Sequence, residues 1–137
     1  MLIAQLLLAS LFSQAQTKIS AVIGNAFAKK FPEAKNVKWG KENAKEYEAE
    51  FLLDGVKTSA NYDLQGNWKE TEKEVSVKDL PEAVAKSIHG KFPSSAITGA
   101  DKIERADGKI IYEAEIKLNG KKKEFELFED GKFVNEK

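Results

Sequence analysis

Few residues in this sequence could carry out covalent chemistry. There is one histidine, His89, and there is no cysteine, which excludes thiol catalysis, disulfides and multi-histidine metal sites. Histidine suits proton transfer near neutral pH, but His89 directly follows Ile88 of an apolar helical stripe and is therefore expected in solvent. Ser94 and Ser95 come soon after it, yet nothing marks a nucleophile elbow or an oxyanion hole. We expect no enzymatic activity, no catalytic residue and no cofactor.

A second group of residues could bind a partner or a cation. Asn119-Gly120 is a two-residue hairpin signal, and it places glutamates of the two flanking strands directly opposite one another. Like charges in that arrangement destabilise a sheet. An apolar pair follows on the same face and is expected to be exposed. Function is expected where such patterning rules are broken, so the candidate binding residues are Ile111, Phe128, Glu113, Glu115, Glu124 and Glu126.

Three interpretations of this surface are open. The glutamates can be ordinary solvated residues, because Lys102 lies opposite Glu113 if Asp107-Gly108 is a two-residue turn. They can belong to a face that binds or inhibits a partner protein, which is our leading functional hypothesis. They can also take part in binding a small ligand or a hard cation such as calcium, which needs several oxygen ligands. The loop spacing of an EF-hand is absent from the sequence, and no metal ligand is assigned.

Two parts of the sequence resemble each other. Lys30-Phe31-Pro32 recurs as Lys91-Phe92-Pro93, and residues 47–51 (YEAEF) recur as residues 112–116 (YEAEI). At the second spacing, Gly66 also matches Gly131. Ordered matches at constant spacing predict an internal duplication. We expect one repeat over residues 17–75 and another over residues 76–137, together forming one compact unit.

Each repeat is expected to begin with a helix. Apolar residues recur at helical spacing before each Phe-Pro pair, and Asp79 with Glu82 has the spacing of a capping box. The two stripes are Ile19, Val22, Ile23, Ala26 and Phe27, and Leu80, Val84, Ile88 and Phe92. Apolar and charged residues then alternate, as in antiparallel strands with one buried face, where Trp39 and Trp68 are expected in the core. The prediction is an α+β fold of tandem α-β4 repeats, with two helices packed on one face of an antiparallel sheet of up to eight strands, which we expect to be continuous.

The first sixteen residues differ from the rest in composition. Residues 1–16 contain no charged side chain, and their apolar run is too short to cross a bilayer. Ser13 and Ala15 have the small side chains of a signal-peptidase site, although no lysine or arginine precedes the apolar run. We interpret residues 1–16 as a signal peptide and expect a periplasmic or secreted protein without a membrane span. An apolar N-terminal helix packed on the domain is the alternative.

The charge balance and the order of the motifs indicate a class of partner. The 22 basic and 22 acidic residues give a net charge of zero, so no nucleic-acid partner is expected. The helix, the Phe-Pro pair, a strand with Trp39, the YEAEF segment and Gly66-Asn67-Trp68 together resemble the PepSY-like family of bacterial envelope proteins. That family is described as similar to beta-lactamase-inhibitor protein. The resemblance covers roughly residues 20–135 and implies a non-enzymatic exported module with an envelope or secreted protein as partner.

Overall fold

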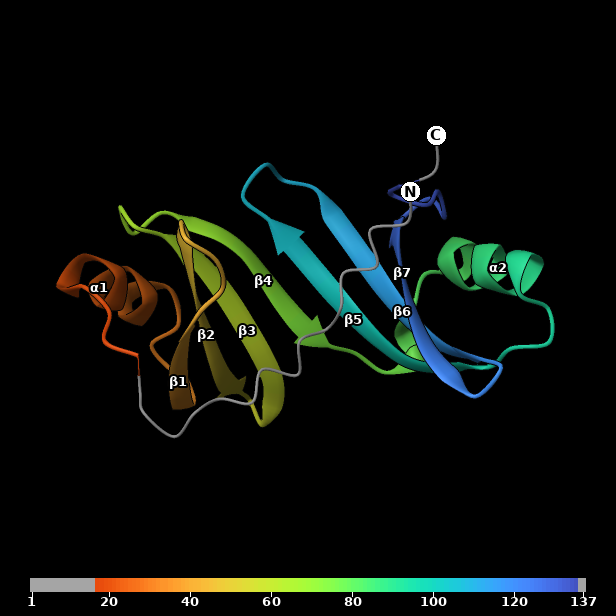
Figure 1. Cartoon of the computed structure of the whole chain (residues 1–137), viewed down its shortest axis with the longest axis horizontal. Coiled ribbons are helices and arrows are strands. Elements are labelled where there is room, and N and C mark those ends of the chain that lie inside the picture. The colour runs from red at the N-terminus through yellow and green to blue at the C-terminus, as the bar shows by residue number, and fades with distance from the viewer. Residues whose placement is uncertain (1–16, 136–137) are drawn as a thin grey trace.

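The computed structural model of the protein describes residues 17–135; the segment interpreted as a signal peptide, residues 1–16, lies outside the described residues. Figure 1 shows the order of the elements. They are α1 (Ala21–Lys30), β1 (Lys35–Lys41), β2 (Glu46–Leu53), β3 (Val56–Asp63), β4 (Trp68–Glu74), a 3₁₀ helix (Val77–Asp79), α2 (Glu82–Lys91), β5 (Ile97–Arg105), β6 (Ile110–Leu118) and β7 (Lys121–Phe128). We call residues 17–75 the N-terminal half and residues 76–135 the C-terminal half.

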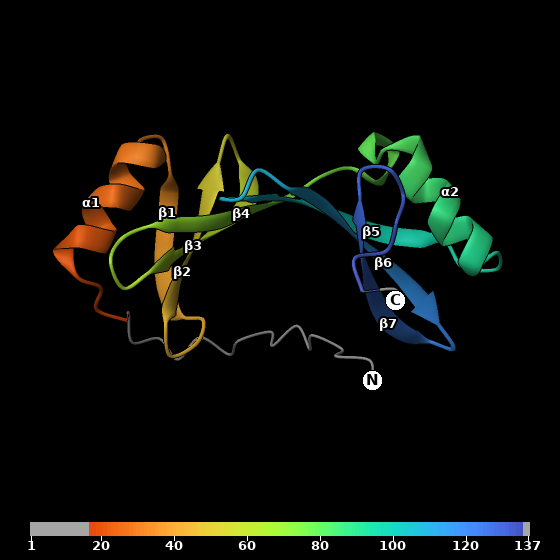
Figure 2. The same cartoon turned by 90° about the horizontal axis from the view of Figure 1, so that it is seen from above.

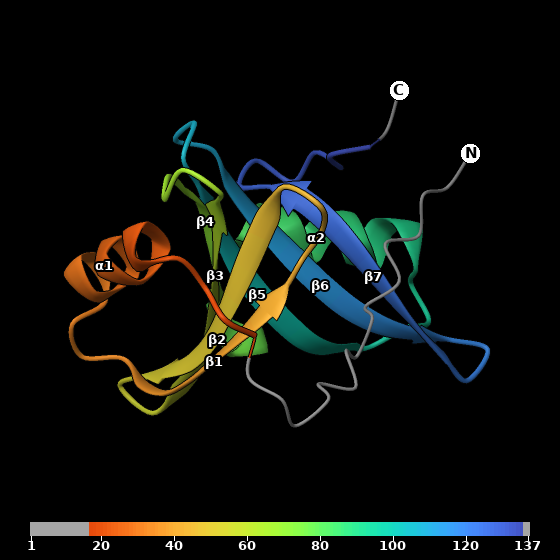
Figure 3. The ribbon, with the colours of Figure 1, turned by 60° about the vertical axis from the view of Figure 1, so that its left-hand side comes forward.

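The seven strands form one antiparallel sheet in which each strand pairs with its neighbours in sequence. The halves join where β4 pairs with β5, from Glu70 opposite Arg105 to Glu74 opposite Asp101. Both helices lie on the same side of the sheet, one over each end (Figure 2), and the sheet twists between them (Figure 3). The α+β class and the continuous sheet are therefore confirmed. The eighth strand is reduced, within residues 17–135, to an isolated bridge between Leu127 and Phe133.

The helices begin and end close to the expected residues. In α1 the Ser20 hydroxyl accepts a hydrogen bond from the Ile23 amide at 3.4 Å, which satisfies one of the unpaired amides of the first turn. Ile23 and Phe27 face the sheet, whereas Val22 is 57% exposed and lies outside the buried stripe. The capping box expected at Asp79 is wrong, because Asp79 belongs to the 3₁₀ helix that precedes α2. The cap position of α2 is Pro81, whose side chain makes no capping hydrogen bond.

The two halves have separate hydrophobic clusters between helix and sheet. In the N-terminal half, Phe27 makes edge contacts with Trp39 and Phe51 at centroid distances of 5.2 and 5.0 Å. Trp68 also packs against this cluster, so both tryptophans belong to the core region as expected. The C-terminal cluster is mainly aliphatic, with Val84, Ile88, Ala114, Ile116 and Leu127 all at 0% exposure. These clusters leave the opposite side of the sheet uncovered by the helices.

Candidate functional site

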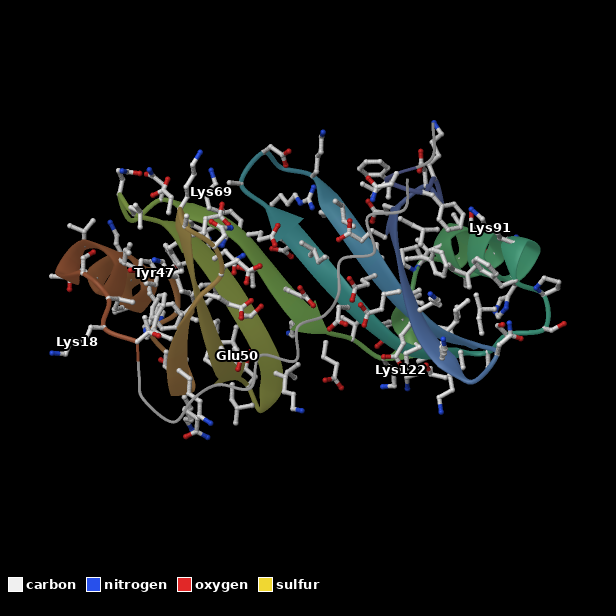
Figure 4. All side chains as sticks on the ribbon, in the orientation of Figure 1. Lys18, Tyr47, Glu50, Lys69, Lys91 and Lys122 are labelled. Atoms are coloured by element: carbon white, nitrogen blue, oxygen red, sulfur yellow. The ribbon has the colours of Figure 1, made fainter. Side chains whose placement is uncertain are left out.

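The side of the sheet away from the helices, which we call the open face, is rich in carboxylates. Strand alternation places apolar residues such as Ala49 and Ala114 under the helices and their acidic neighbours on the other side. Figure 4 views the molecule onto the open face, with oxygen atoms gathered over the central strands between the labelled Glu50 and Lys122. The acidic residues of this face include Glu48 and Glu50 on β2, Glu70 and Glu72 on β4, Asp101 on β5, Glu113 and Glu115 on β6, and Glu124 and Glu126 on β7.

The expected pairing of β6 with β7 is confirmed. Glu113 lies opposite Glu126, Glu115 lies opposite Glu124, and Ile111 lies opposite Phe128. All four glutamates and Phe128 are partly buried. The expectation that Ile111 is exposed is wrong: its side chain is 0% exposed. Ile103, which lies opposite Ile111 on β5, is 3% exposed. Ile103 and Ile111 therefore lie beneath the surface, and Phe128, on the other side of Ile111, is the residue of these three that reaches solvent.

The register of β5 and β6 differs from the expected one. Asp107-Gly108 does not form a two-residue turn, because Asp107 lacks the positive φ that Asp54 and Asn119 adopt in theirs. The Arg105 amide instead donates to the Lys109 carbonyl at 3.0 Å, which places one more residue in the turn. The pairings from Gly99 to Glu104 therefore shift by one residue, and such a shift moves the side chains of this part of β5 to the other face.

This shift changes the charge at the centre of the open face. Lys102 lies opposite Tyr112, on the helix side, and its ammonium group contacts Glu104 at 3.3 Å. The residue opposite Glu113 is Asp101. The expected Lys102–Glu113 pair is therefore wrong, and an acidic residue takes the place of the lysine.

Three carboxylates from three strands converge at the junction of the halves. Carboxylate oxygens of Glu72, Asp101 and Glu113 all lie within 4.8 Å of one another. Glu72 belongs to β4 in the N-terminal half, and the other two residues belong to β5 and β6 in the C-terminal half. We call these residues the junction triad. Oxygen ligands of this type suit hard cations, and carboxylates also pair with lysine and arginine side chains.

The surroundings of the triad favour protonated carboxyl groups. Burial, together with the charges of Glu124, Glu72, Asp101 and Glu126, raises the pKa of Glu113 to about 8. Burial and neighbouring carboxylates also raise the pKa of Glu72 to about 7. The pKa of Asp101 is raised by burial and by the charges of Glu74 and Glu115. The charged neighbours that shift these three groups are thus all carboxylates.

Glu48 extends this environment into the N-terminal half. Burial and the charges of Glu42, Glu50 and Glu70 raise its pKa to about 7. Its partner across the strand pair is the neutral Asn61. Protonation near neutral pH is therefore a property of the centre of the open face and extends over more than one strand pair.

Cationic side chains lie around this centre. The Arg105 guanidinium contacts Glu70 at 3.3 Å, and the Lys122 ammonium contacts Glu115 at 3.3 Å. Glu115 also accepts a 2.7 Å hydrogen bond from the Thr98 hydroxyl, and these interactions, the Thr98 bond first, hold its pKa below the usual range. Of the predicted glutamates, Glu115 therefore lies at the rim with its charge balanced by Lys122. Glu113 lies at the centre, where its charged neighbours are carboxylates.

Sequence reasoning missed half of this face. The alternation in β2 already placed Glu48 and Glu50 on the exposed side, but their β3 partners are Asn61 and Ser59, so no like-charge pair drew attention to them. Glu72 and Asp101 come together through the β4–β5 pairing, whose register has no short turn to specify it. The glycine of the turn at 106–108 could have indicated the position of Asp101, since Gly108 follows the same hydrogen-bonding pattern as Gly66 in the turn between β3 and β4.

The other candidate residues lie away from the open face. His89 is exposed in the last turn of α2, as expected from its position beside the apolar stripe.

Within residues 17–135, no helix is long and apolar enough to cross a membrane.

Comparison with known proteins gives a family match and several structural neighbours. The sequence model of the PepSY-like family, described as beta-lactamase-inhibitor-like, matches residues 45–135. No curated protein sequence matches the chain. A BLIP-like protein from Bacteroides fragilis is 25% identical, with a TM-score of 0.73 and coverage of 90% of this chain and 88% of that one.

Two further solved structures have the same fold. A protein from Bacteroides eggerthii described as periplasmic is 15% identical, with a TM-score of 0.79 over 87% of this chain and 88% of that one. A DUF2874 family protein from Bacteroides uniformis is 19% identical, with a TM-score of 0.78 over 86% and 88% of the two chains. At these identities the likeness shows the fold.

Proposed function

Because the chain belongs to the PepSY-like family, which is described as beta-lactamase-inhibitor-like, we propose that it is a non-catalytic binding protein of the cell envelope. In this proposal the open face of the sheet and the adjoining hairpin loops contact another protein and inhibit or sequester it. Export to the periplasm or beyond is part of the proposal, and it is supported by the composition of residues 1–16 and by the periplasmic description of the Bacteroides eggerthii neighbour.

One observation carries the proposal. Both helices cover the same side of the sheet (Figure 2), while the other side holds partly buried carboxylates whose charged neighbours are carboxylates as well. Such an arrangement costs free energy in the isolated protein. A partner that supplies compensating groups would recover that cost on binding.

The proposal is tested by capture from an envelope extract of the source cells. The wild-type protein is immobilised beside a Phe128→Asp variant, which places a charge on the apolar side of the open face. Val22→Asp is the matched control, because Val22 is 57% exposed on α1, on the other side of the sheet, and the same charge is introduced there. Circular dichroism establishes that all three proteins are folded.

We expect wild type and Val22→Asp to retain the same envelope protein and Phe128→Asp to lose it. Identical captured proteins for Phe128→Asp and wild type would contradict a role for the open face. Glu126 and Glu124 also lie on β7, so the Glu124→Lys and Glu126→Lys variants test whether the acidic side chains contribute to the same interaction.

A second candidate function is the binding of a cation such as calcium, and the junction triad is the observation that favours it. Its carboxylate oxygens lie within 4.8 Å of one another, whereas Glu115, a predicted residue of this face, is already engaged by Thr98 and Lys122. If calcium binds, the melting temperature rises with calcium concentration, and Glu113→Gln removes the rise while Glu115→Gln keeps most of it. An unchanged melting temperature in millimolar calcium would contradict this function.

A further inference from the structure

We propose that the open face recognises a cationic segment of its protein partner, with lysine or arginine side chains seated over the junction triad. This inference rests on the proposed protein-binding function and specifies the chemistry of the partner.

The distribution of charge indicates a cation from outside. The cations of the described part of this face lie toward its rim: Arg105 contacts Glu70, and Lys122 contacts Glu115. Lys38 and Lys57 act on Glu50, where they oppose the effect of burial on its pKa. The triad is left with acidic neighbours. Complementary charge on a partner would therefore be attracted to the centre of the face.

The geometry of the triad fits a side-chain cation. Its oxygens lie within 4.8 Å of one another, so one guanidinium or ammonium group placed among them reaches more than one carboxylate. Charge-assisted hydrogen bonds of this kind are among the stronger ones in proteins. Glu126 lies directly opposite Glu113 on the outer strand, and it offers a further acceptor for a second cation of the same segment.

An apolar row beside the triad favours lysine or arginine over a hydrated metal ion. The row consists of Ile103, Ile111 and Phe128, which lie in directly opposed positions on β5, β6 and β7, and it begins beside Glu72 of the triad, which lies opposite Ile103. Lysine and arginine have apolar stems below their charged heads. Such a stem can lie along the Phe128 end of the row while the head reaches the carboxylates, and a metal ion gains nothing from this row.

Proton release would accompany such binding. Glu113 is surrounded by Glu72 on β4, Asp101 on β5 and Glu124 and Glu126 on β7, and its pKa is raised to about 8. A bound cation favours the ionised form. Affinity for a cationic segment should therefore increase between pH 6 and pH 8, which is unusual for a simple surface ion pair whose carboxylate is fully ionised at pH 6.

The test uses two short peptides that differ only in charge. The first is acetyl-Arg-Leu-Arg-Leu-Arg-amide, and the second has citrulline, a neutral isostere, in place of each arginine. Binding to the purified protein is measured by calorimetry at pH 6, 7 and 8. The variant carries Glu72→Gln, Asp101→Asn and Glu113→Gln. The matched control carries Glu33→Gln, Glu82→Gln and Glu129→Gln, at exposed positions outside the open face, and removes the same number of carboxyl groups.

We expect the arginine peptide to bind the wild type and the control alike, to bind the triad variant at least about tenfold more weakly, and to bind more tightly at pH 8 than at pH 6. The citrulline peptide should not bind. Equal weakening in both variants, or equal binding of both peptides, would overturn the inference. If the arginine peptide fails while capture by the open face succeeds, the charge assignment is wrong and the proposed function stands. If the peptide binds as expected and capture shows no dependence on Phe128, the proposed function fails and the cation site stands.

Discussion

The N-terminal and C-terminal halves build the same helix-on-sheet arrangement from different side chains. Under α1 the cluster is aromatic, with Phe27 in ring contact with Phe31, Trp39, Phe51 and Tyr62. Under α2 it is mainly aliphatic, and Ile88 occupies the place in α2 that Phe27 occupies in α1. The backbone arrangement thus follows from the spacing of apolar residues, and many side-chain combinations satisfy it.

The open faces of the two halves also differ. In the N-terminal half a neutral strand separates the acidic ones, because Ser59 and Asn61 of β3 lie opposite Glu50 and Glu48 of β2. In the C-terminal half acidic residues of β5, β6 and β7 are direct neighbours, as Asp101, Glu113 and Glu126 show. The helix faces therefore have equivalent roles in the two halves, while the crowding of carboxylates is concentrated in the second half and at the junction.

The largest expected effect comes from the aromatic core. Phe27→Ala should reduce the free energy of unfolding by about 4 kcal/mol, and Ile88→Ala by about 3 kcal/mol, because each leaves a cavity under a helix. Urea denaturation measures both losses. Near-ultraviolet circular dichroism should follow the same transition as the far-ultraviolet signal, since the halves share one sheet. An Ile88→Ala protein that loses half of its secondary structure before its aromatic signal changes would show that the halves unfold separately.

The next largest difference in stability is expected at the turn glycines, Gly131 in the C-terminal half and Gly66 in the N-terminal half. Gly131 has a φ of +85°, and a Cβ there would lie 2.5 Å from the Ala83 carbonyl oxygen. Gly131→Ala should cost about 3 kcal/mol, since strain and overlap with the α2 backbone add together. Gly66→Ala should cost less, because its nearest neighbour is the exposed side chain of Val22, at 2.7 Å, and the nearest backbone atom, the Val22 carbonyl oxygen, is farther away, at 3.1 Å.

Gly108→Ala measures the strain alone. Its φ is +83°, and an added Cβ would meet nothing within 4 Å, so a loss of about 1 kcal/mol is expected in urea denaturation. A Gly131→Ala protein as stable as Gly108→Ala would mean that α2 moves away from the turn at little cost.

The pH dependence of stability should be dominated by the acidic centre. Glu48, Glu72 and Glu113 have pKa values raised to about 7, 7 and 8, so the folded protein holds protons that the unfolded chain releases near pH 4.5. Stability from this source is complete below that pH and is lost as the pH rises through 7 and 8. Each pKa unit corresponds to about 1.4 kcal/mol for an isolated group, and solvent reduces this figure for groups that it still reaches. We therefore expect the free energy of unfolding to fall by at least about 1–2 kcal/mol from pH 5 to pH 8.

Two glutamine variants sharpen this pH comparison. Glu113→Gln should flatten the pH profile more than Glu48→Gln, because the pKa of Glu113 is raised further. Glu115→Gln should act in the opposite sense, since the pKa of Glu115 is lowered by Thr98 and Lys122 and its stabilising effect is present above its unfolded pKa. Thermal unfolding at a series of pH values measures all three. A Glu113→Gln profile that matches the wild type would contradict the assignment.

A smaller effect is expected from a buried hydroxyl. Tyr62 is 1% exposed, and within residues 17–135 its hydroxyl group has no hydrogen-bond partner. The place of Tyr62 beside Trp68 is taken in the C-terminal half by Leu127 beside Phe133. Tyr62→Phe should raise the free energy of unfolding by about 1 kcal/mol, because it removes an unpaired buried group without changing the ring. A loss of stability would indicate that the hydroxyl is satisfied in solution.

The smallest effect concerns a cation over a ring. The Lys30 ammonium lies 3.9 Å from the Trp68 ring centroid, and the Lys91 ammonium lies 4.4 Å from that of Phe133. Lys30→Met should cost about 0.5–1 kcal/mol, because tryptophan is the best ring for this interaction. Lys29→Met, at an exposed position in the same helical turn, is the control and should change little. Equal losses in urea denaturation would assign the effect to charge at the end of the helix.

The fold was largely predictable because its signals are local. The helical stripe that contains Ile23 and Phe27, and the alternation around Ala49 and Ala114, each need only a few neighbouring residues. The Asn119-Gly120 turn fixed the β6–β7 register correctly, since both residues adopt positive φ. The internal duplication and the division at residue 75 stay predictions of the sequence.

The site was only partly predictable because it depends on register between distant segments. Because Asp107-Gly108 was predicted to be a two-residue turn, Lys102 was expected opposite Glu113 on the open face, where the structure has Asp101. Glu72 meets Asp101 through a pairing of two strands that a helix and a loop separate in the chain. The exposure of Ile111 was also misjudged, because alternation specifies the face of the sheet on which a side chain lies and does not specify how deeply it is buried there.

The pairing of β4 with β5 has a consequence for any attempt to divide the molecule. Each half produced alone would present an unpaired inner strand with free backbone amides and carbonyls, a surface that recruits other strands and promotes aggregation. Glu72 would also part from Asp101 and Glu113. Binding at the junction triad is therefore expected only in the undivided chain. When two separately produced fragments are mixed, binding should return to the extent that β4 pairs with β5 again.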